Sequence, residues 1–260
     1  MVKKIRLQVA LAQLGFASRR AAAGIIRSGR VRVNQQPVLE PGYRVDLVLD
    51  AITVAGRPGL IQNKVYYILN KPKGITSTVK DRFAQRTVLD LIKPLKQRIY
   101  PVGRLDKDTT GLIILTNDGT TAYRLTHPKF GLKRVYRAKV RGVPSRKKLM
   151  RLEKGVILEG VQTAPCRIEL VGRQAKSAFL KIELKQGRKR QIKKMLALIG
   201  HPLLSLERTA FGPFELTGLK SGQWRRLSKT EIEELKGCLK AAAGSINKGK
   251  TGSADKSYFA

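Results

Sequence analysis

The segment 103–119 carries the side chains of this chain that are best placed to do chemistry. It reads Gly-Arg-Leu-Asp-Lys-Asp-Thr-Thr-Gly-Leu-Ile-Ile-Leu-Thr-Asn-Asp-Gly and places Asp106 in a turn between Arg104 and Lys107, ahead of an apolar run. A nearby guanidinium favours the ionised form of a carboxyl group. An ionised Asp106 could act as a nucleophile or a base. By itself the pattern also fits a turn cap or an exposed ion pair, which is the commoner use of such an aspartate.

Positive charge dominates the composition. The 260 residues include 53 Lys and Arg against 18 Asp and Glu, a formal net charge of +35, yet 42% of the chain is hydrophobic. Such an apolar share is typical of a folded protein, and so large a charge predicts a polyanionic partner, most commonly nucleic acid. No apolar stretch approaches the roughly 18 residues of a membrane span, and the start lacks the apolar region of a signal peptide. We therefore expect a cytoplasmic protein with no membrane partner.

The familiar motifs of cofactor and metal chemistry are missing from the sequence. The chain has two cysteines, Cys166 and Cys238, which cannot form a disulfide framework or a four-cysteine zinc site. It has no Gly-x-Gly-x-x-Gly after a strand, no phosphate-binding Gly-x-x-x-x-Gly-Lys-Ser/Thr and no cluster of His and Cys. We therefore expect neither a metal nor a small-molecule cofactor.

The first 60 residues predict a small module that could hold RNA. Apolar spacing indicates a short helix over 5–16, and Ser18 is placed to cap a second helix that ends before Gly29. Basic and apolar residues alternate over 30–34, which is the pattern of a half-buried strand, and 45–54 is rich in β-branched residues.

The remaining chain predicts a larger domain of mixed composition. Strands are expected at 65–69, 112–116, 135–140 and 178–184, with helical signals near 88–91 and a helix over about 189–199. Strands outnumber helices and the two do not alternate strictly, so the fold class is α+β. With a linker at 56–59, the expected organisation is a first domain over 1–58, a second over 62–238 and a disordered basic tail over 241–260.

The first module resembles the S4 RNA-binding domain. The matching residues are Gly15-Phe16-Ala17-Ser18-Arg19-Arg20, Ile26 and the segment Ser28-Gly29-Arg30-Val31-Arg32-Val33-Asn34. The resemblance implies an RNA-binding arm, and the basic residues of the helix and the following strand can neutralise phosphates without reading base sequence. The residues expected to do so are Arg19, Arg20, Arg27, Arg30 and Arg32.

Three further motifs, in order, resemble the RsuA/RluB/RluE/RluF family of rRNA pseudouridine synthases. They are Leu69-Asn70-Lys71-Pro72-Lys73-Gly74, the segment 103–119, and Gln186-Gly187-Arg188-Lys189-Arg190-Gln191-Ile192-Lys193-Lys194-Met195. The resemblance covers about residues 5–235 and implies an S4-like domain followed by a mainly antiparallel synthase domain. It also implies isomerisation of a uridine in ribosomal RNA, a reaction without redox change or hydrolysis. Large-subunit (23S) rRNA is the expected target, and small-subunit (16S) rRNA is the alternative.

The resemblance also implies which residues act. Asp106 occupies the family's catalytic position, where it could attack C1′ or C6 or remove the C2′ proton. Tyr136 matches the active-site tyrosine that stacks on an extruded base. Arg188 is expected to pair with Asp106, and Arg104 or Arg190 could do so instead. The basic residues expected to contact RNA in this domain are Arg104, Lys189, Arg190, Lys193 and Lys194.

The expected partner is ribosomal RNA, free or within an assembly intermediate, and we expect the protein to act as a monomer. Two other functions compete with catalysis. One is an RNA-binding or ribosome-assembly protein that has kept the fold and lost turnover; intact Asp106, Tyr136 and Arg188 argue against it. The other is DNA binding, which is disfavoured because no helix-turn-helix or zinc finger is evident.

Overall fold

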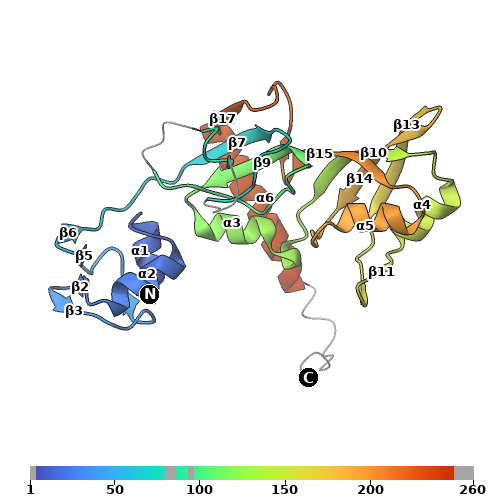
Figure 1. Ribbon diagram of the computed structural model, residues 1–260. Helices are drawn as coiled ribbons and strands as arrows, with labels where there is room; N and C mark the ends of the chain where they lie inside the picture. The colour runs from blue at the N-terminus through green and yellow to red at the C-terminus, as the bar shows by residue number, and fades with distance from the viewer. Residues whose placement is uncertain (1–3, 80–85, 93–96, 249–260) are drawn as a thin grey trace. The chain divides into compact units, whose positions relative to one another are not determined.

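The computed structural model describes residues 4–79, 86–92 and 97–248, with side chains to residue 244 (Figure 1). Contacts divide the chain into two compact units. The small unit consists of Met1–Val65, Pro94–Ile99 and Asn117–Gly119, and the large unit consists of Tyr66–Lys93, Tyr100–Thr116 and Thr120–Ala260. Each unit has its own hydrophobic core.

The small unit packs two helices against short strands. The Ser18 hydroxyl accepts a hydrogen bond from the Ala21 amide and so caps the second helix, as predicted. Leu7, Leu11, Ile26 and Val31 are fully buried and form much of its core. Its elements are β1 (Ile5–Arg6), α1 (Leu7–Gln13), α2 (Arg19–Arg27), β2 (Val31–Val33), β3 (Gln36–Pro37), β4 (Arg44–Val45), β5 (Ile52–Val54) and β6 (Arg57–Pro58).

The large unit is built on one sheet with the strand order β13-β14-β10-β15-β9-β7-β17. All neighbours along this order are antiparallel except β15 and β9, which are parallel. Two short strands, β8 and β16, pair with β9 and β15. The strands are β7 (Tyr66–Lys71), β8 (Tyr100–Pro101), β9 (Thr110–Thr116), β10 (Arg134–Arg141), β13 (Arg167–Gln174), β14 (Ser177–Leu184), β15 (Leu203–Phe211), β16 (Phe214–Glu215) and β17 (Trp224–Arg226).

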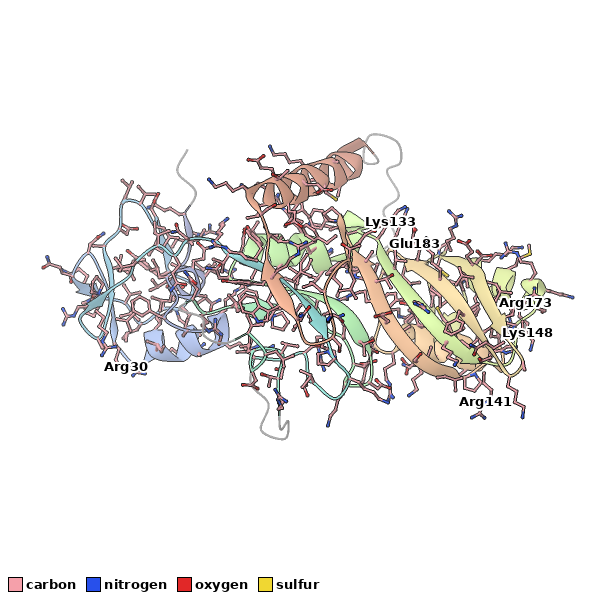
Figure 2. The ribbon with its side chains drawn as sticks, turned by 90° about the horizontal axis from the view of Figure 1, so that it is seen from above. Arg30, Lys133, Arg141, Lys148, Arg173 and Glu183 are labelled. Carbon is pink, nitrogen blue, oxygen red and sulfur yellow. The ribbon has the colours of Figure 1, made fainter. Side chains whose placement is uncertain are left out.

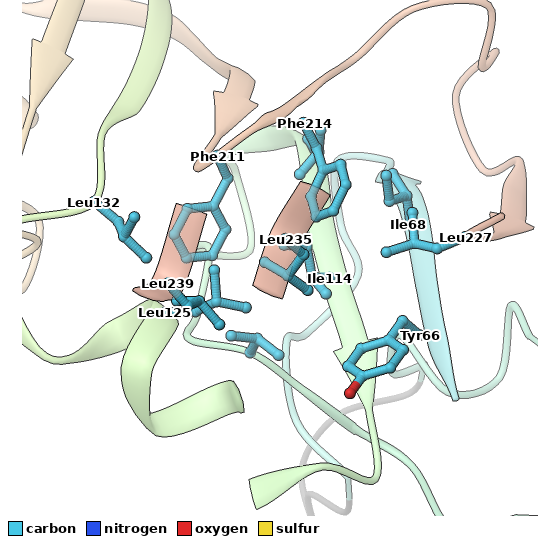
Figure 3. Packing of buried hydrophobic residues seen from close by; sticks show 12 residues of the cluster. Tyr66, Ile68, Ile114, Leu125, Leu132, Phe211, Phe214, Leu227, Leu235 and Leu239 are labelled. Atoms are coloured by element: carbon cyan, nitrogen blue, oxygen red, sulfur yellow. The ribbon is translucent and has the colours of Figure 1, made fainter. Parts of the chain in front are cut away.

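Helices pack against this sheet and bury its apolar side chains. The main cluster joins Ile68 and Ile114 of the sheet with Leu125 of α3 and with Leu235 and Leu239 of α6 (Figure 3). A short hairpin, β11 with β12, lies between α4 and β13 in the sequence. The remaining elements are α3 (Gly119–Thr126), the 3-10 helix η1 (Pro128–Phe130), α4 (Arg146–Glu153), β11 (Ile157–Leu158), β12 (Val161–Gln162), α5 (Gln191–Leu198) and α6 (Lys229–Lys248).

The α+β class and most of the expected strands are confirmed, and three local predictions are wrong. Residues 88–91 form turns because the Val88 amide donates to the Thr76 carbonyl instead of continuing a helix. The first helix begins at Leu7, since Ile5 and Arg6 pair with β4. The predicted strand over 45–54 is interrupted by a turn at 47–49 between β4 and β5.

The expected disordered tail also needs correction. Helix α6 extends to Lys248, so residues 241–248 are helical. Ala241, Ala242 and Ala243 are strong helix formers, and Ala242 packs against the core cluster of the large unit. The rest of the predicted tail, 249–260, lies outside the described residues.

No helix in the described part of the chain has the length and apolarity to cross a membrane.

Candidate active site

A cavity of about 460 Å³ opens within the large unit, and Asp106 and Tyr136 both line it. Asp106 comes from the loop between β8 and β9, and Tyr136 comes from β10. Arg188, from the loop before α5, lines the same cavity. The fold therefore brings together a carboxylate, a phenol and a guanidinium that lie far apart in the sequence.

Hydrogen bonds fix the backbone on both sides of Asp106. On one side, the Ser77 hydroxyl donates to the Leu105 carbonyl at 3.0 Å and accepts from the Leu105 amide at 3.2 Å. On the other side, the Lys107 carbonyl accepts from the Gly74 amide at 2.8 Å and from the Lys71 ammonium at 3.5 Å. The Asp106 side chain itself is exposed. A loop held by hydrogen bonds on both sides thus presents an accessible carboxylate to the cavity.

Lys71 is a fully buried cation beneath this loop. Its ammonium donates to the carbonyls of Pro72 at 3.0 Å and Ile75 at 2.8 Å, in addition to Lys107. Burial lowers the pKa of the Lys71 ammonium from its ordinary value of 10.5 to about 8, and the carboxylates of Asp108 and Asp106 oppose part of that change. Lys71 thus joins the segment after β7 to the Asp106 loop and places a positive charge near the carboxylates.

The lowered pKa of Lys71 predicts a pH dependence of stability. Between about pH 8 and pH 10.5 the unfolded chain keeps the Lys71 proton while the folded chain loses it. The unfolded state then binds more protons, so the free energy of unfolding should rise with pH in this window. We expect the difference between the wild type and Lys71→Met, measured by urea unfolding, to grow in favour of the wild type from pH 8 to pH 10.5. Parallel pH curves for the two proteins would contradict the assignment.

Tyr136 lies on the sheet beside two buried arginines. Its ring is buried, it faces Arg208 of β15 across the strand pair, and Arg134 precedes it by two residues on β10. Arg134 and Arg208 are 7% and 2% exposed, and both guanidinium groups lie over the ring of Phe211, at 5.1 and 4.7 Å from its centroid. All four side chains line the cavity with Asp106. The cavity therefore has an aromatic and cationic wall.

The predicted pairing of Arg188 with Asp106 is not found among the described residues. The Arg188 guanidinium instead donates to the carbonyls of Val161 at 2.9 Å and Leu158 at 3.2 Å, because the β11–β12 hairpin lies within its reach. The ion pairs of the described residues also do not join Asp106 to Arg104 or Arg190. Arg188 thus fastens the hairpin at the edge of the cavity.

The other basic residues expected near the site divide into two groups. Those that line the cavity are Arg104, Lys189, Arg190 and Lys193. A second hollow of about 540 Å³ shares Asp106, Lys189 and Arg190 with it. The Lys193 ammonium lies 4.0 Å from the Asp108 carboxylate, which also lines both hollows. Lys194 is not among the lining residues, since its ammonium pairs with Glu159 of the hairpin turn at 2.6 Å.

The arginines expected to bind RNA in the small unit are all exposed. Three of them lie on α2, one directly precedes β2 and one lies on β2: Arg19, Arg20, Arg27, Arg30 and Arg32. Arg30 donates to the Ser28 hydroxyl and Arg32 to the Gln35 carbonyl. The ion pairs of the described residues involve none of the five. Their charges are thus available to an external anion.

Sequence reasoning missed Lys71, Arg134 and Arg208 as cavity or loop-supporting residues. Arg134 could have been found, because residues two apart on a strand share a face and Tyr136 was already assigned. Lys71 ends a fully buried strand, and a lysine there signals a partner. Arg208 gives no local signal, since its place depends on pairing with strands distant in the sequence. Across the described ranges, no group of three His, Cys, Asp or Glu side chains is placed to hold a metal.

Comparison with known proteins assigns the family. The family model for RNA pseudouridylate synthase matches residues 65–198, and the S4 domain model matches residues 5–48. The chain belongs to the RNA pseudouridylate synthase family. The two matched ranges coincide with the segments of this pseudouridine synthase that resemble the synthase family and the S4 domain in sequence. Members of the synthase family are isomerases that act on RNA, and so is this enzyme.

Relatives and a solved structure cover nearly all of this synthase. It is 39% identical over 233 residues to ribosomal large subunit pseudouridine synthase B of Bacillus subtilis, which covers 89% of this chain and 95% of that protein. It is 40% identical to an uncharacterized RNA pseudouridine synthase of Aquifex aeolicus, with 89% and 94% covered. A crystal structure of a pseudouridylate synthase matches with a TM-score of 0.65 and 28% identity, over 89% of this chain and 99% of the other.

Proposed function

We propose that this enzyme converts one specific uridine of large-subunit (23S) ribosomal RNA to pseudouridine. The similarity to the Bacillus large-subunit enzyme, over most of both chains, supports the choice of subunit. The observation that supports the chemistry is the cavity that Asp106 and Tyr136 line together with several cations. A cavity of about 460 Å³ is ample for one extruded nucleotide.

The reaction exchanges one bond for another within the nucleotide. The N1–C1′ bond breaks, the uracil turns, and C5 bonds to C1′; C5 loses a proton and N1 gains one. The accessible Asp106 carboxylate supplies the group that acts on the ribose or the ring. Tyr136 supplies a stacking face for the uracil, which offsets part of the few kcal/mol that base extrusion costs, since such stacking contributes about 1–3 kcal/mol. In this proposal Arg188 holds the β11–β12 hairpin in place and does not position Asp106.

Basic side chains at two places would hold the RNA around the target. The first is the set of exposed arginines on α2, on β2 and just before β2, where Arg30 is labelled in Figure 2. The second is one end of the large unit, where Figure 2 shows Arg141, Lys148 and Arg173 together. All three are exposed. Such contacts add affinity through counterion release and position the RNA without selecting its sequence.

We also propose that the enzyme acts as a monomer in the cytoplasm. Its substrate would be free rRNA or a ribosomal assembly intermediate. Asp106, Tyr136 and Arg188 line one cavity within a single copy of the chain, which is compatible with a monomer. The +35 net charge also disfavours self-association in the absence of RNA.

Mapping of pseudouridine on rRNA tests the proposed substrate. Carbodiimide-induced primer-extension stops should appear at one 23S position when the protein is present and disappear when its gene is deleted. A new stop confined to 16S rRNA would overturn the choice of subunit. Unchanged stops on both rRNAs would favour a non-catalytic RNA-binding protein.

Removing charge from α2 should weaken binding without changing chemistry. We expect the double variant Arg19→Ala/Arg20→Ala to bind rRNA fragments less tightly, and the slope of log K against log salt to fall by about 1.4–1.8 if each arginine neutralises one phosphate. The single-turnover rate at saturating protein should equal that of the wild type. Arg146→Ala, which removes an exposed arginine already paired with Glu153 at 2.8 Å, is the matched control for binding. A slower saturated rate in the double variant would show that the small unit also shapes the active site.

A further inference from the structure

Two buried cations of the cavity have no acidic partner. Arg134 and Arg208 appear in none of the ion pairs of the described residues. The causes that act on the pKa of Arg134 are burial, which lowers it, Tyr136, which raises it, and the like charge of Arg208, which lowers it again. No carboxylate contributes. Placing two neighbouring positive charges in a buried site is costly unless something negative enters it.

Arg208 differs from Arg134 in having a free donor. The three hydrogen bonds of Arg134 end on the carbonyls of Leu125, Thr126 and Lys185, so its guanidinium is held by the backbone. Arg208 donates from Nε to the Leu112 carbonyl at 2.7 Å, whereas its Nη2 is buried and has no hydrogen-bond partner among the described residues. A buried donor left unpaired costs about 1–3 kcal/mol. The protein thus leaves the guanidinium of Arg208, whose side chain lines the cavity, only partly paired, and this points to an acceptor on the substrate.

The chemistry of the reaction supplies that acceptor. If Asp106 attacks C1′ or removes the C2′ proton, the N1–C1′ bond breaks and its electron pair leaves with the uracil, whose negative charge spreads over N1, O2 and O4. If Asp106 adds to C6, the new O–C6 bond breaks the C5=C6 π bond, whose electron pair moves to C5 and O4 as an enolate. In every route the pyrimidine becomes an anion, and in every route a carbonyl oxygen carries part of the charge.

We propose that Arg208, supported by Arg134, is a catalytic residue whose cavity-lining guanidinium donates to a carbonyl oxygen of the target uracil and stabilises the pyrimidine anion. Phe211 holds both guanidinium groups in place before substrate arrives, and Tyr136, opposite Arg208 on the neighbouring strand, would stack the uracil beside them. A preorganised cation that meets developing negative charge lowers the barrier without binding the ground state more tightly. This inference rests on the proposed uridine isomerisation.

Substrates with different leaving-group stability test the proposal. Fluorine at C5 withdraws electrons and stabilises the pyrimidine anion, so a 5-fluorouridine target needs less help from the protein. We expect Arg208→Met to slow single-turnover consumption of the uridine target by about a hundredfold to a thousandfold. The loss on the 5-fluorouridine target, followed by mass spectrometry of digested RNA, should be roughly tenfold smaller. RNA affinity should be unchanged.

Two further variants make the outcome decisive. Arg208→Lys keeps the charge, so its rate losses on the uridine and 5-fluorouridine targets should differ by less than those of Arg208→Met. If Arg208→Met does not fold, the comparison of Arg208→Lys with the wild type on the two targets tests the proposal. Arg137→Met removes an exposed arginine from β10 that does not line the cavity, and it should match the wild type on both substrates. Equal losses on both substrates, or no loss, would overturn the role of Arg208. A wild type inactive on uridine would instead overturn the proposed function.

Discussion

Asp106→Asn should abolish pseudouridine formation, with a loss of more than about a thousandfold in single-turnover rate, while RNA affinity stays within a fewfold of the wild type. Asparagine keeps the size of the side chain but has neither the charge of a nucleophile nor the basicity to take a proton. All three routes open to the carboxylate therefore fail together. Release of tritium from RNA labelled at uracil C5 measures the loss, because C5 gives up its hydrogen only when the new bond forms.

The fold should survive this substitution, which makes the result interpretable. The Asp106 side chain is exposed, and the bonds that hold the loop come from the backbone of Leu105 and Lys107. Glu169→Gln removes a carboxylate from an exposed position on β13 and serves as the charge-matched control. Full tritium release by Asp106→Asn would remove the proposed mechanism, whatever its effect on binding.

Gly111→Ala should strongly destabilise the large unit, at a cost of about 2–5 kcal/mol in the free energy of unfolding. Gly111 has φ +102°, a backbone conformation that alanine adopts only with strain. Its added Cβ would overlap the Arg208 carbonyl oxygen and lie 2.7 Å from the Arg208 amide nitrogen. These are backbone atoms of the paired strand and cannot rotate away, so β9 and β15 must separate.

A matched glycine distinguishes overlap from strain. Gly218 also has a positive φ, +69°, but a Cβ there would meet no atom within 4 Å. Gly218→Ala should therefore cost only about 1 kcal/mol, whereas Gly111→Ala should lose stability and turnover together, because Asp106 precedes β9 and Arg208 lies on β15. Urea unfolding monitored by circular dichroism gives both values. Equal costs for the two variants would contradict the close packing of β9 against β15.

Local patterns in the sequence predicted the elements whose formation depends on near neighbours. Ser18 caps α2, and alternation over 135–140 marks β10. The helix expected over 189–199 is found as α5, Gln191–Leu198, two residues shorter at its start because Arg190 adopts a left-handed conformation. The turns at 88–91 were mistaken for helix, since a hydrogen bond to Thr76 outweighs helix propensity there.

The site was predictable only in part, because several of its contacts join residues that are distant in the sequence. Asp106 and Tyr136 were found through motifs, and the structure places them on one cavity. The partner of Arg188 was predicted wrongly, because the β11–β12 carbonyls that it binds carry no side-chain signal in the sequence. Arg208 was missed because its position follows from parallel pairing between strands about a hundred residues apart. Such pairing depends on tertiary structure rather than on local spacing.

The parallel pair of β9 and β15 has a consequence for the timing of activity during synthesis. Glu207 and Arg208 pair with Thr110 and Gly111, so the centre of the sheet closes only after the chain has been made past β15. Contacts this distant in sequence form late in folding. A nascent chain that has already exposed Asp106 and Tyr136 therefore still lacks the wall that completes the cavity. A chain truncated before β15 should therefore show no turnover, because Arg208 and the pairing of β15 with β9 are both missing.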